Sequence, residues 1–226
     1  MAINTDTNAT EKTKSGISSI KKGSLFGIIG IIISIPIYFI DFLFISDITG
    51  MIKLYAGLSS SPGITSDSSI IYAIFIIFGF LSFIFYIISI LNYRKGFGYY
   101  MVEDKRFSGP YSFSKYIVIF FFIMIAVFAL LLLINFGAAR IGAIPFSGSG
   151  ALIAMLAILI IVLIFSILAL IGIIYLIIGL FDFSEKYNQG IGKVGAILYI
   201  IPFAALLAPI FIYIAASHAE KENNTA

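Results

Sequence analysis

The sequence contains no cysteine and only one histidine, His218, near its C-terminus. The absence of cysteine excludes disulfides, thiolate metal sites and cysteine nucleophiles. A lone histidine excludes any multi-histidine metal site within one chain. We therefore expect no metal site, no cofactor and no catalytic residues, and we predict that the protein is not an enzyme.

Charge is also scarce, since Asp, Glu, Lys and Arg make up 11% of the 226 residues, whereas hydrophobic residues make up 61%. Soluble globular domains are about half apolar and about a quarter charged. A water-soluble fold of this length could not cover its surface with so few polar side chains. This composition excludes a soluble domain and predicts an integral membrane protein.

Five long apolar runs without the two-residue alternation of barrel strands predict membrane-spanning helices. The predicted spans are residues 24–45, 69–91, 116–136, 151–181 and 194–216. They define an all-α fold, a polytopic five-transmembrane-helix bundle over residues 23–217. Residues 1–22 are expected to form a disordered cytoplasmic tail, and residues 218–226 a short outer tail. Because the fourth run is longer than a bilayer requires, we expect it to project from the membrane or to kink near Gly172.

The basic residues are distributed unevenly along the chain. Eleven of the 14 Lys and Arg residues lie before the first predicted span, between the second and third, or between the fourth and fifth. The other three, Lys53, Arg140 and Lys221, lie in the alternate segments. Basic residues near span ends favour the cytoplasmic side, so we predict a cytoplasmic N-terminus and a C-terminus outside the cell membrane.

Small residues, prolines and hydroxyl-bearing residues recur every three or four positions in three of the predicted spans. They are Gly23, Gly27, Gly30, Ser34, Tyr38 and Asp41 in the first span, Tyr72, Gly79, Ser82, Tyr86, Ser89 and Tyr93 in the second, and Gly195, Tyr199, Pro202, Pro209 and Tyr213 in the fifth, where Leu206 occupies the remaining place of the stripe. Membrane helices approach each other closely at such stripes. We interpret the stripes as packing seams, with a substrate path lined by hydroxyl groups as the alternative.

Asp41 is the only ionisable residue inside a predicted span. It lies about 6 Å of helix rise from the outer end of that span, where it can reach interfacial water. Arg140 follows the third span on the same side, so the two residues form a candidate polar membrane site. We expect a structural role for Asp41, paired with Arg140 or facing water, and the alternative is the coupling of an ion or a proton.

Residues 92–115, between the second and third predicted spans, mix basic and aromatic side chains. This mixture is typical of a membrane interface, where aromatic rings lie at headgroup depth and cations face anionic lipid. Nucleic acid would also attract such residues, but we favour membrane lipid and predict no nucleic-acid partner. A homo-oligomer or a membrane-protein complex is the other expected kind of partner.

The predicted spans are rich in isoleucine, and the sequence also lacks tryptophan. In segments 93–98 (YRKGFG), 185–188 (EKYN), 195–203 (GAILYIIPF) and 208–213 (APIFIY), the chain resembles uncharacterised multi-span membrane proteins of thermoacidophilic archaea of the Sulfolobus type. That resemblance implies an archaeal lineage and a tetraether-lipid cell membrane that faces acid. It implies no catalytic residue, because that family has no established activity.

The sequence therefore predicts a structural or accessory role, in which a helical bundle organises a membrane complex or the surrounding lipid. The alternative is a small transporter or channel with Asp41 as a coupling or pore group. A polar cavity at the membrane midplane would favour transport, whereas a fully packed seam between the spans would favour the structural role.

Overall fold

The computed structural model describes residues 4–45, 66–140, 149–201 and 204–225. The described residues form seven α-helices and two short 3₁₀ helices, and no strand occurs among them. The helices are α1 (Asn4–Ile45), α3 (Ser66–Met101), α4 (Ser108–Phe113), α5 (Lys115–Arg140), α6 (Ser149–Lys186), α7 (Gly190–Leu198) and α8 (Ala208–Thr225), with the 3₁₀ helices η1 (Lys105–Phe107) and η2 (Ala204–Leu206). The predicted all-α fold is confirmed.

Four stretches of the described chain are long and apolar enough to cross a membrane. They are Thr10–Pro36, Ile77–Met101, Lys105–Val127 and Leu156–Lys186. These stretches fall in α1, in α3, in the segment from η1 to α5, and in α6, which overlap the first four predicted spans. The described residues thus contain four such candidates instead of the five that the sequence predicts.

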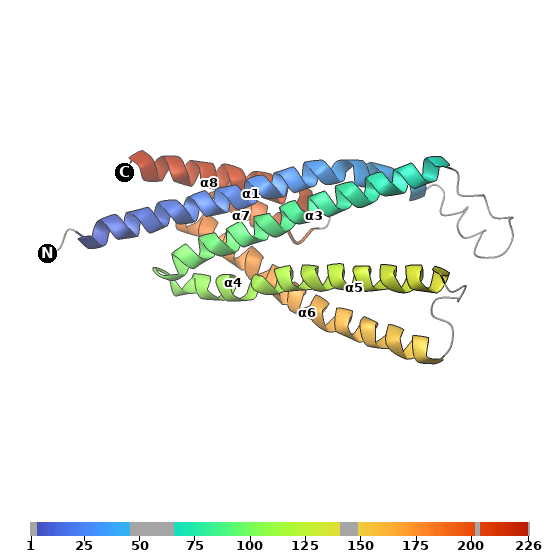
Figure 1. Ribbon diagram of the computed structural model, residues 1–226. Helices are drawn as coiled ribbons and strands as arrows, with labels where there is room; N and C mark the ends of the chain where they lie inside the picture. Colours follow the sequence, from blue (N-terminus) through green and yellow to red (C-terminus); the bar gives the residue numbers. More distant parts are fainter. Residues whose placement is uncertain (1–3, 46–65, 141–148, 202–203, 226) are drawn as a thin grey trace.

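The long helices are arranged as two pairs (Figure 1). α1 and α3 lie side by side along most of their length, whereas α5 and α6 meet near α4 and diverge towards their far ends. α8 packs on α1, and α7 packs on α6. The two termini consequently lie at the same end of the molecule, close to the turn that joins α3 to α4.

The interface between α1 and α3 is built from the predicted stripes. Ser82 donates a hydrogen bond from Oγ to the carbonyl oxygen of Gly30 at 2.9 Å. Ser89 donates one to the carbonyl oxygen of Gly23 at 2.7 Å. A Cβ atom on Gly23 would lie 2.8 Å from Cδ1 of Tyr93, so only glycine fits there without a shift. Small residues let the two backbones approach closely, and the predicted packing seam is confirmed for this helix pair.

The predicted fifth span, residues 194–216, is not one continuous helix in the structure. α7 ends at Leu198, α8 begins at Ala208, and the two helices pack against each other as a hairpin. Gly195 permits this contact, since a Cβ atom there would lie 2.8 Å from the nearest side-chain atom of α8. Pro209 lies in the first turn of α8, where a missing backbone N–H breaks no helical hydrogen bond. This proline, which lies inside the predicted fifth span, stands at the start of a separate helix.

Both segments that were expected to be tails are helical where the structure describes them. α1 already begins at Asn4, within the predicted tail of residues 1–22, and Ile17 and Ile20 in it are buried. At the other end of the chain, α8 continues to Thr225, and Ala219 is completely buried. These residues have little or no exposed surface because α1, α3, α6 and α8 pack together there.

An ion pair joins the two terminal helices. Nζ of Lys21 in α1 lies 2.6 Å from Oε2 of Glu220 in α8. The N-terminal and C-terminal helices therefore meet at one end of the molecule, whereas the sequence predicted the two termini on opposite sides of a membrane. The hairpin of α7 and α8 returns the chain to the end at which it began (Figure 1).

α6 is a single α-helix from Ser149 to Lys186 and continues without a break through Gly172. Gly172 is a contact point between helices, because a Cβ atom there would lie 2.8 Å from Cγ1 of Ile117 and 3.0 Å from the carbonyl oxygen of Phe113. The missing side chain lets α6 cross the start of α5 closely. Beyond this crossing the two helices separate (Figure 1).

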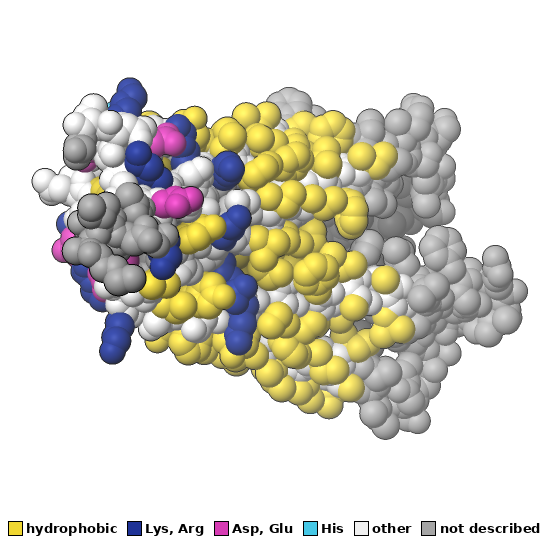
Figure 2. Space-filling model, turned by 60° about the vertical axis from the view of Figure 1, so that its left-hand side comes forward, with side chains coloured by type: hydrophobic (Ala, Val, Ile, Leu, Met, Phe, Trp, Pro, Cys, Tyr) yellow, Lys and Arg dark blue, Asp and Glu magenta, His cyan; other side chains and the backbone are white. Residues whose placement is uncertain are grey.

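The buried core gathers at the end of the molecule that holds the termini. Its largest buried apolar side chains are Ile17, Ile20, Tyr93, Phe97, Tyr100, Phe107, Leu180, Phe183 and Ile212. Charged side chains surround the same end, and a broad apolar band adjoins them (Figure 2). We call this part the charged end, which comprises residues 10–24, 92–116, 180–195 and 211–225.

Candidate functional site

The interior of the charged end is a cluster of aromatic rings from α3, η1 and α6. The ring centroid of Tyr100 lies 5.1 Å from that of Phe107 and 5.9 Å from that of Phe183. The ring of Tyr187 lies 6.2 Å away, and its hydroxyl donates a hydrogen bond to the Tyr100 hydroxyl at 3.2 Å. Burial raises the pKa of Tyr187, so this hydroxyl stays protonated and keeps its donor role.

This cluster places three aromatic residues of the segment 92–115 differently from the sequence prediction. α3 continues to Met101 and α4 follows η1, so the segment is mostly helical. Phe97, Tyr100 and Phe107 each have 0% of their surface exposed. These three rings therefore pack inside the protein, whereas the sequence predicted aromatic rings at headgroup depth. The residues of α6 that cover them lie far away in the sequence.

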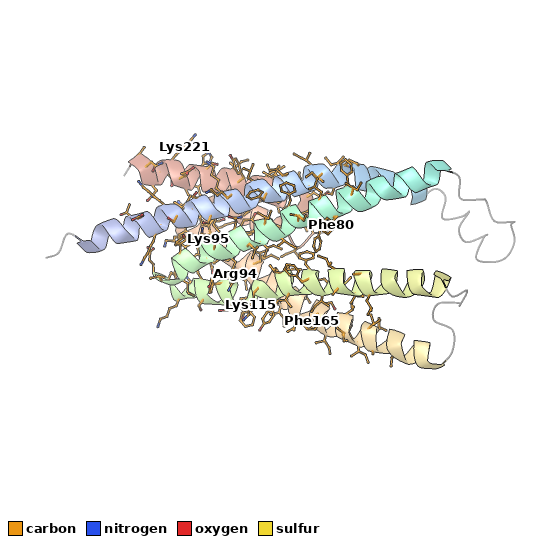
Figure 3. The ribbon with its side chains drawn as sticks, in the orientation of Figure 1. Phe80, Arg94, Lys95, Lys115, Phe165 and Lys221 are labelled. Atoms are coloured by element: carbon orange, nitrogen blue, oxygen red, sulfur yellow. The ribbon has the colours of Figure 1, made fainter. Side chains whose placement is uncertain are left out.

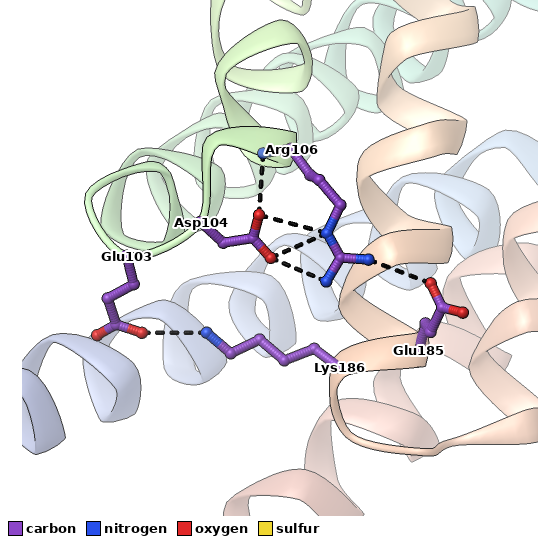
Figure 4. Close-up of polar contacts among 5 residues, drawn as sticks. All are labelled: Glu103, Asp104, Arg106, Glu185 and Lys186. Atoms are coloured by element: carbon purple, nitrogen blue, oxygen red, sulfur yellow. Dashed lines mark hydrogen bonds and ion pairs between the residues drawn. The ribbon is translucent and has the colours of Figure 1, made fainter.

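Five charged side chains connect the turn after α3 to the end of α6 (Figure 4). Arg106 pairs with Asp104 at 2.8 Å and with Glu185 at 3.3 Å. Lys186 pairs with Glu103 at 3.0 Å. Asp104 also accepts a hydrogen bond from the backbone N–H of Arg106 at 3.0 Å, which caps η1.

Every charge in this network has a partner of opposite sign. Hydrogen bonds from Arg106 hold the pKa of Asp104 below its usual range, so that carboxylate is ionised at neutral pH. Partly exposed pairs contribute little stability individually. Their effect here is to fix how the turn after α3 sits against the end of α6.

A second polar group lies between α1, α3 and α7. The Tyr93 hydroxyl donates a hydrogen bond to Oγ of Ser24 at 3.1 Å and lies 3.3 Å from the Tyr199 hydroxyl. Ser24 in turn donates to the carbonyl oxygen of Ile20 at 3.0 Å. The group contains only hydroxyls and a carbonyl, so it ties α7 to the seam between α1 and α3 without introducing a charge.

A cavity of about 370 Å³ opens between α1, α3 and α8. Its polar lining includes Glu11, Lys14, Lys22, Lys95, Glu220 and Asn223. Nδ2 of Asn223 is buried and has no hydrogen-bond partner among the described residues. Since these residues belong to the charged end, the cavity lies away from the middle of the long helices, where a transport path would need to pass.

The predicted pair Asp41 and Arg140 lies at the other end of the molecule. Asp41 belongs to α1, and Arg140 is the last residue of α5. The ends of these two helices lie opposite the charged end (Figure 1). Both side chains fall outside the part of the chain whose side chains are described, so their pairing stays a prediction.

Metal-ligating side chains do not gather within the described residues, where no group of three or more His, Cys, Asp or Glu could hold a metal ion.

The network of charged side chains was not predicted from the sequence. Its members are Glu103, Asp104, Arg106, Glu185 and Lys186. A signal for it was present, because opposite charges follow the second and fourth predicted spans on one predicted side. The pairing itself depends on how α6 meets α3.

Comparison with known proteins returns one family. The family model described as a protein of unknown function, DUF973, matches residues 14–225. No curated protein and no solved structure matches the chain. The match agrees with the expectation of an uncharacterised family, and the archaeal lineage stays a prediction.

Proposed function

The chain belongs to the DUF973 family of proteins of unknown function, and from its geometry we propose that it is an integral membrane protein with a structural or accessory role. In this role the long helices anchor the protein in a cell membrane. The charged end then presents a packed surface to lipid headgroups, to a second copy of the chain or to another membrane protein. We propose no enzymatic activity.

The exposed apolar surface of the long helices supports the membrane assignment. In the most apolar stretch of α6, 11% of the residues are buried. The exposed side chains of this stretch include Leu156, Leu159, Leu163, Ile164, Ile167 and Leu170. Soluble proteins rarely expose apolar patches of this extent, whereas a bilayer removes them from water. Figure 2 shows this surface as a broad band next to the charged end.

The basic residues support an orientation for the whole chain. Because the hairpin returns Lys221 to the charged end, twelve of the 14 Lys and Arg residues belong to that end. Arg140 is the last residue of α5, and Lys53 falls outside the described residues. Basic residues near span ends favour the cytoplasmic side. We therefore propose that the charged end and both termini are cytoplasmic, with four spans and the α7–α8 hairpin on the same bundle.

Labelling of single cysteines tests this orientation, because the natural chain contains no cysteine. Lys12→Cys in α1 and Lys221→Cys in α8 should both react with a membrane-impermeant maleimide in inside-out vesicles. Neither should react in intact cells. Opposite labelling of the two positions would overturn the shared cytoplasmic location.

The closed seam between α1 and α3 is the observation that favours a structural role over transport. Ser82 and Ser89 donate their hydroxyl hydrogens directly to carbonyl oxygens of α1, so these groups do not face a water-filled space. α8 covers the same seam, since a Cβ atom on Gly27 would lie 3.1 Å from Cβ of Pro209. These two serines, which could have lined a substrate path, are used in contacts between helices.

Isolation of the full-length protein from its native membranes, with chemical cross-linking before mild solubilisation, tests the role. We expect a stable complex that contains further copies or a second membrane protein. We also expect no solute flux in proteoliposomes above that of empty liposomes. A monomer that moves a solute, with flux abolished by Asp41→Asn in folded protein, would overturn the proposal in favour of a transporter.

A further inference from the structure

The outer face of α3 changes from apolar to basic within about one helical turn. Ile77, Ile84 and Leu91 lie seven residues apart on this face, with 63%, 37% and 44% of their surfaces exposed. Lys95 follows Leu91 by four residues and is also exposed. Residues at this spacing lie on one side of a helix. The face therefore runs from the apolar band directly into the charged end.

A groove of about 360 Å³ lies at this change, between α3 and α4. Its walls include Leu91, Arg94, Lys95, Tyr99, Met101 and Tyr111. The lining carries two cations and no carboxylate, together with two tyrosines, one glycine and the apolar side chains of Leu91 and Met101. A groove of this composition complements a ligand that combines an anionic group with an apolar part.

Arg94 is held in place by α4. Its Nε atom donates a hydrogen bond to the carbonyl oxygen of Tyr111 at 3.1 Å. Its guanidinium carbon lies 4.5 Å from the centroid of the Tyr111 ring. The two terminal nitrogens of Arg94 form no hydrogen bond or ion pair with the residues that the structure describes. They form a positioned pair of donors, which suits two oxygens of one phosphate group.

Gly98 allows this arrangement. A Cβ atom at that position would lie 3.0 Å from Cε2 of Tyr111. The absence of a side chain lets the Tyr111 ring rest on α3, and Arg94 stacks on that ring. The glycine thereby sets the shape of the groove.

The groove lies at the level where headgroups would be. Arg94, Lys95 and Lys115 stand at a similar level along the bundle, while Phe80 and Phe165 lie farther towards the apolar end (Figure 3). Basic side chains also border the apolar band of the surface (Figure 2). Basic pockets on the cytoplasmic side of membrane helices favour anionic lipid headgroups.

We propose that this groove binds the phosphate headgroup of an anionic membrane lipid, with Arg94 and Lys95 on the phosphate oxygens and the lipid chain along Leu91, Ile84 and Ile77. The inference rests on the proposed membrane location and names a ligand class for the charged end. A soluble phosphate ester would share the anionic group but would leave the exposed apolar face of α3 uncovered. The lipid is therefore the occupant that matches both halves of the groove.

Native mass spectrometry of the full-length protein in detergent micelles tests the proposal. The probes are phosphatidylglycerol and phosphatidylcholine with the same acyl chains, together with glycerol 3-phosphate and inorganic phosphate. We expect phosphatidylglycerol to bind more tightly than phosphatidylcholine, and the two soluble phosphates to bind weakly. Arg94→Gln and Lys95→Gln should each weaken phosphatidylglycerol binding about fivefold.

Lys221→Gln is the matched control, because Lys221 is an exposed lysine of the charged end that does not line the groove (Figure 3). It should bind phosphatidylglycerol like the natural protein. Gly98→Ala should weaken phosphatidylglycerol binding without any change in charge, since it displaces the Tyr111 ring. Arg94→Gln also removes a contact with α4, so Lys95→Gln decides the outcome if the Arg94 variant misfolds.

Two results would overturn the inference. One is equal binding of phosphatidylglycerol by the natural protein and by folded Lys95→Gln. The other is binding of glycerol 3-phosphate as tight as that of phosphatidylglycerol, which would identify a soluble phosphate as the ligand.

Reconstitution into nanodiscs separates failure of this inference from failure of the proposed function. Protein that inserts but does not select anionic lipid contradicts only this inference, whereas protein that stays folded and monodisperse without lipid or detergent contradicts the membrane location itself.

Discussion

The charged end and the apolar arms of the molecule contain the same kinds of apolar side chain, which are buried at the charged end and exposed in the arms. We define the apolar arms as residues 119–130 of α5 and 156–174 of α6. Phe97 at the charged end has 0% of its surface exposed, whereas Phe122 in the arms is 59% exposed. Within α6 itself, Leu180 is 0% exposed and Leu159 is 64% exposed.

This contrast shows that the most apolar part of the chain is not the most buried part. The candidate span in α6 is the most apolar of the four, and 11% of its most apolar stretch is buried, against 44% in the less apolar stretch of α1. In water, apolar side chains must pack against each other to leave the solvent. Lipid chains are as apolar as leucine, so helices in a bilayer gain little by burying such side chains. The chain therefore concentrates its packed core where the proposed membrane ends.

Replacing one phenylalanine in each region should give the largest difference in unfolding free energy between the two regions. Phe97→Ala removes a ring whose centroid lies 6.1 Å from that of Phe107, in the core of the charged end. We expect a loss of about 3–5 kcal/mol in the free energy of unfolding. Phe122→Ala should change it by less than about 0.5 kcal/mol. Unfolding by denaturant in detergent micelles, followed by circular dichroism, measures both; equal losses would contradict the contrast.

A glycine substitution tests whether the seam between α1 and α3 depends on close packing of the two helices. A Cβ atom on Gly23 would lie 2.8 Å from the Tyr93 ring and 3.0 Å from the carbonyl oxygen of Ser89, a backbone atom that cannot easily move. Gly23→Ala should therefore cost about 1–3 kcal/mol in the free energy of unfolding. The same unfolding assay applies.

Gly190→Ala is the control for that measurement. No heavy atom lies within 4 Å of a Cβ atom built on Gly190. This substitution should be neutral or slightly stabilising, because alanine restricts the unfolded chain. A Gly23→Ala variant as stable as Gly190→Ala would mean that α1 and α3 are not held by close backbone contact.

Acid should weaken the charged end by the smallest of these effects. The pKa of Asp104 is held below its usual range by Arg106, so its contribution to stability is present above the pKa of an unfolded aspartate, about 3.9. That contribution is lost as the pH falls through the lower pKa of the folded state. Asp104→Asn should reduce the difference in melting temperature between pH 7 and pH 3. An unchanged difference would mean that Asp104 does not contribute to the acid response.

The seam and the fifth span show how far the sequence could lead. Ser82 and Ser89 were identifiable from their spacing, because helical periodicity is a local property that survives in the fold. Residues 194–216 were predicted as one span because their length and apolar composition suit a single helix. The same composition also suits two short helices, which the structure contains. What separates the two outcomes is the packing of α7 on α8, which involves residues on both sides of the turn.

The candidate site followed the same division. The basic and aromatic composition of residues 92–115 identified the charged end as the region of interest. Composition could not assign Phe97 and Tyr100 to the core and Arg94 to the groove. These residues are close in the sequence and differ in what covers them, because the rings that pack on Phe97 and Tyr100 come from η1 and α6.

The sequence by itself determined the helical class, the apolar runs of four candidate spans, the uneven distribution of basic residues and the stripes of small residues. Each of these is a property of local composition or spacing, which does not depend on contacts with distant residues. Only the tertiary structure decided that the chain returns to its starting end. The reason is physical: the contacts that fix this return, such as Lys21 with Glu220, join residues 199 positions apart, and no local pattern records which distant partner a side chain will meet.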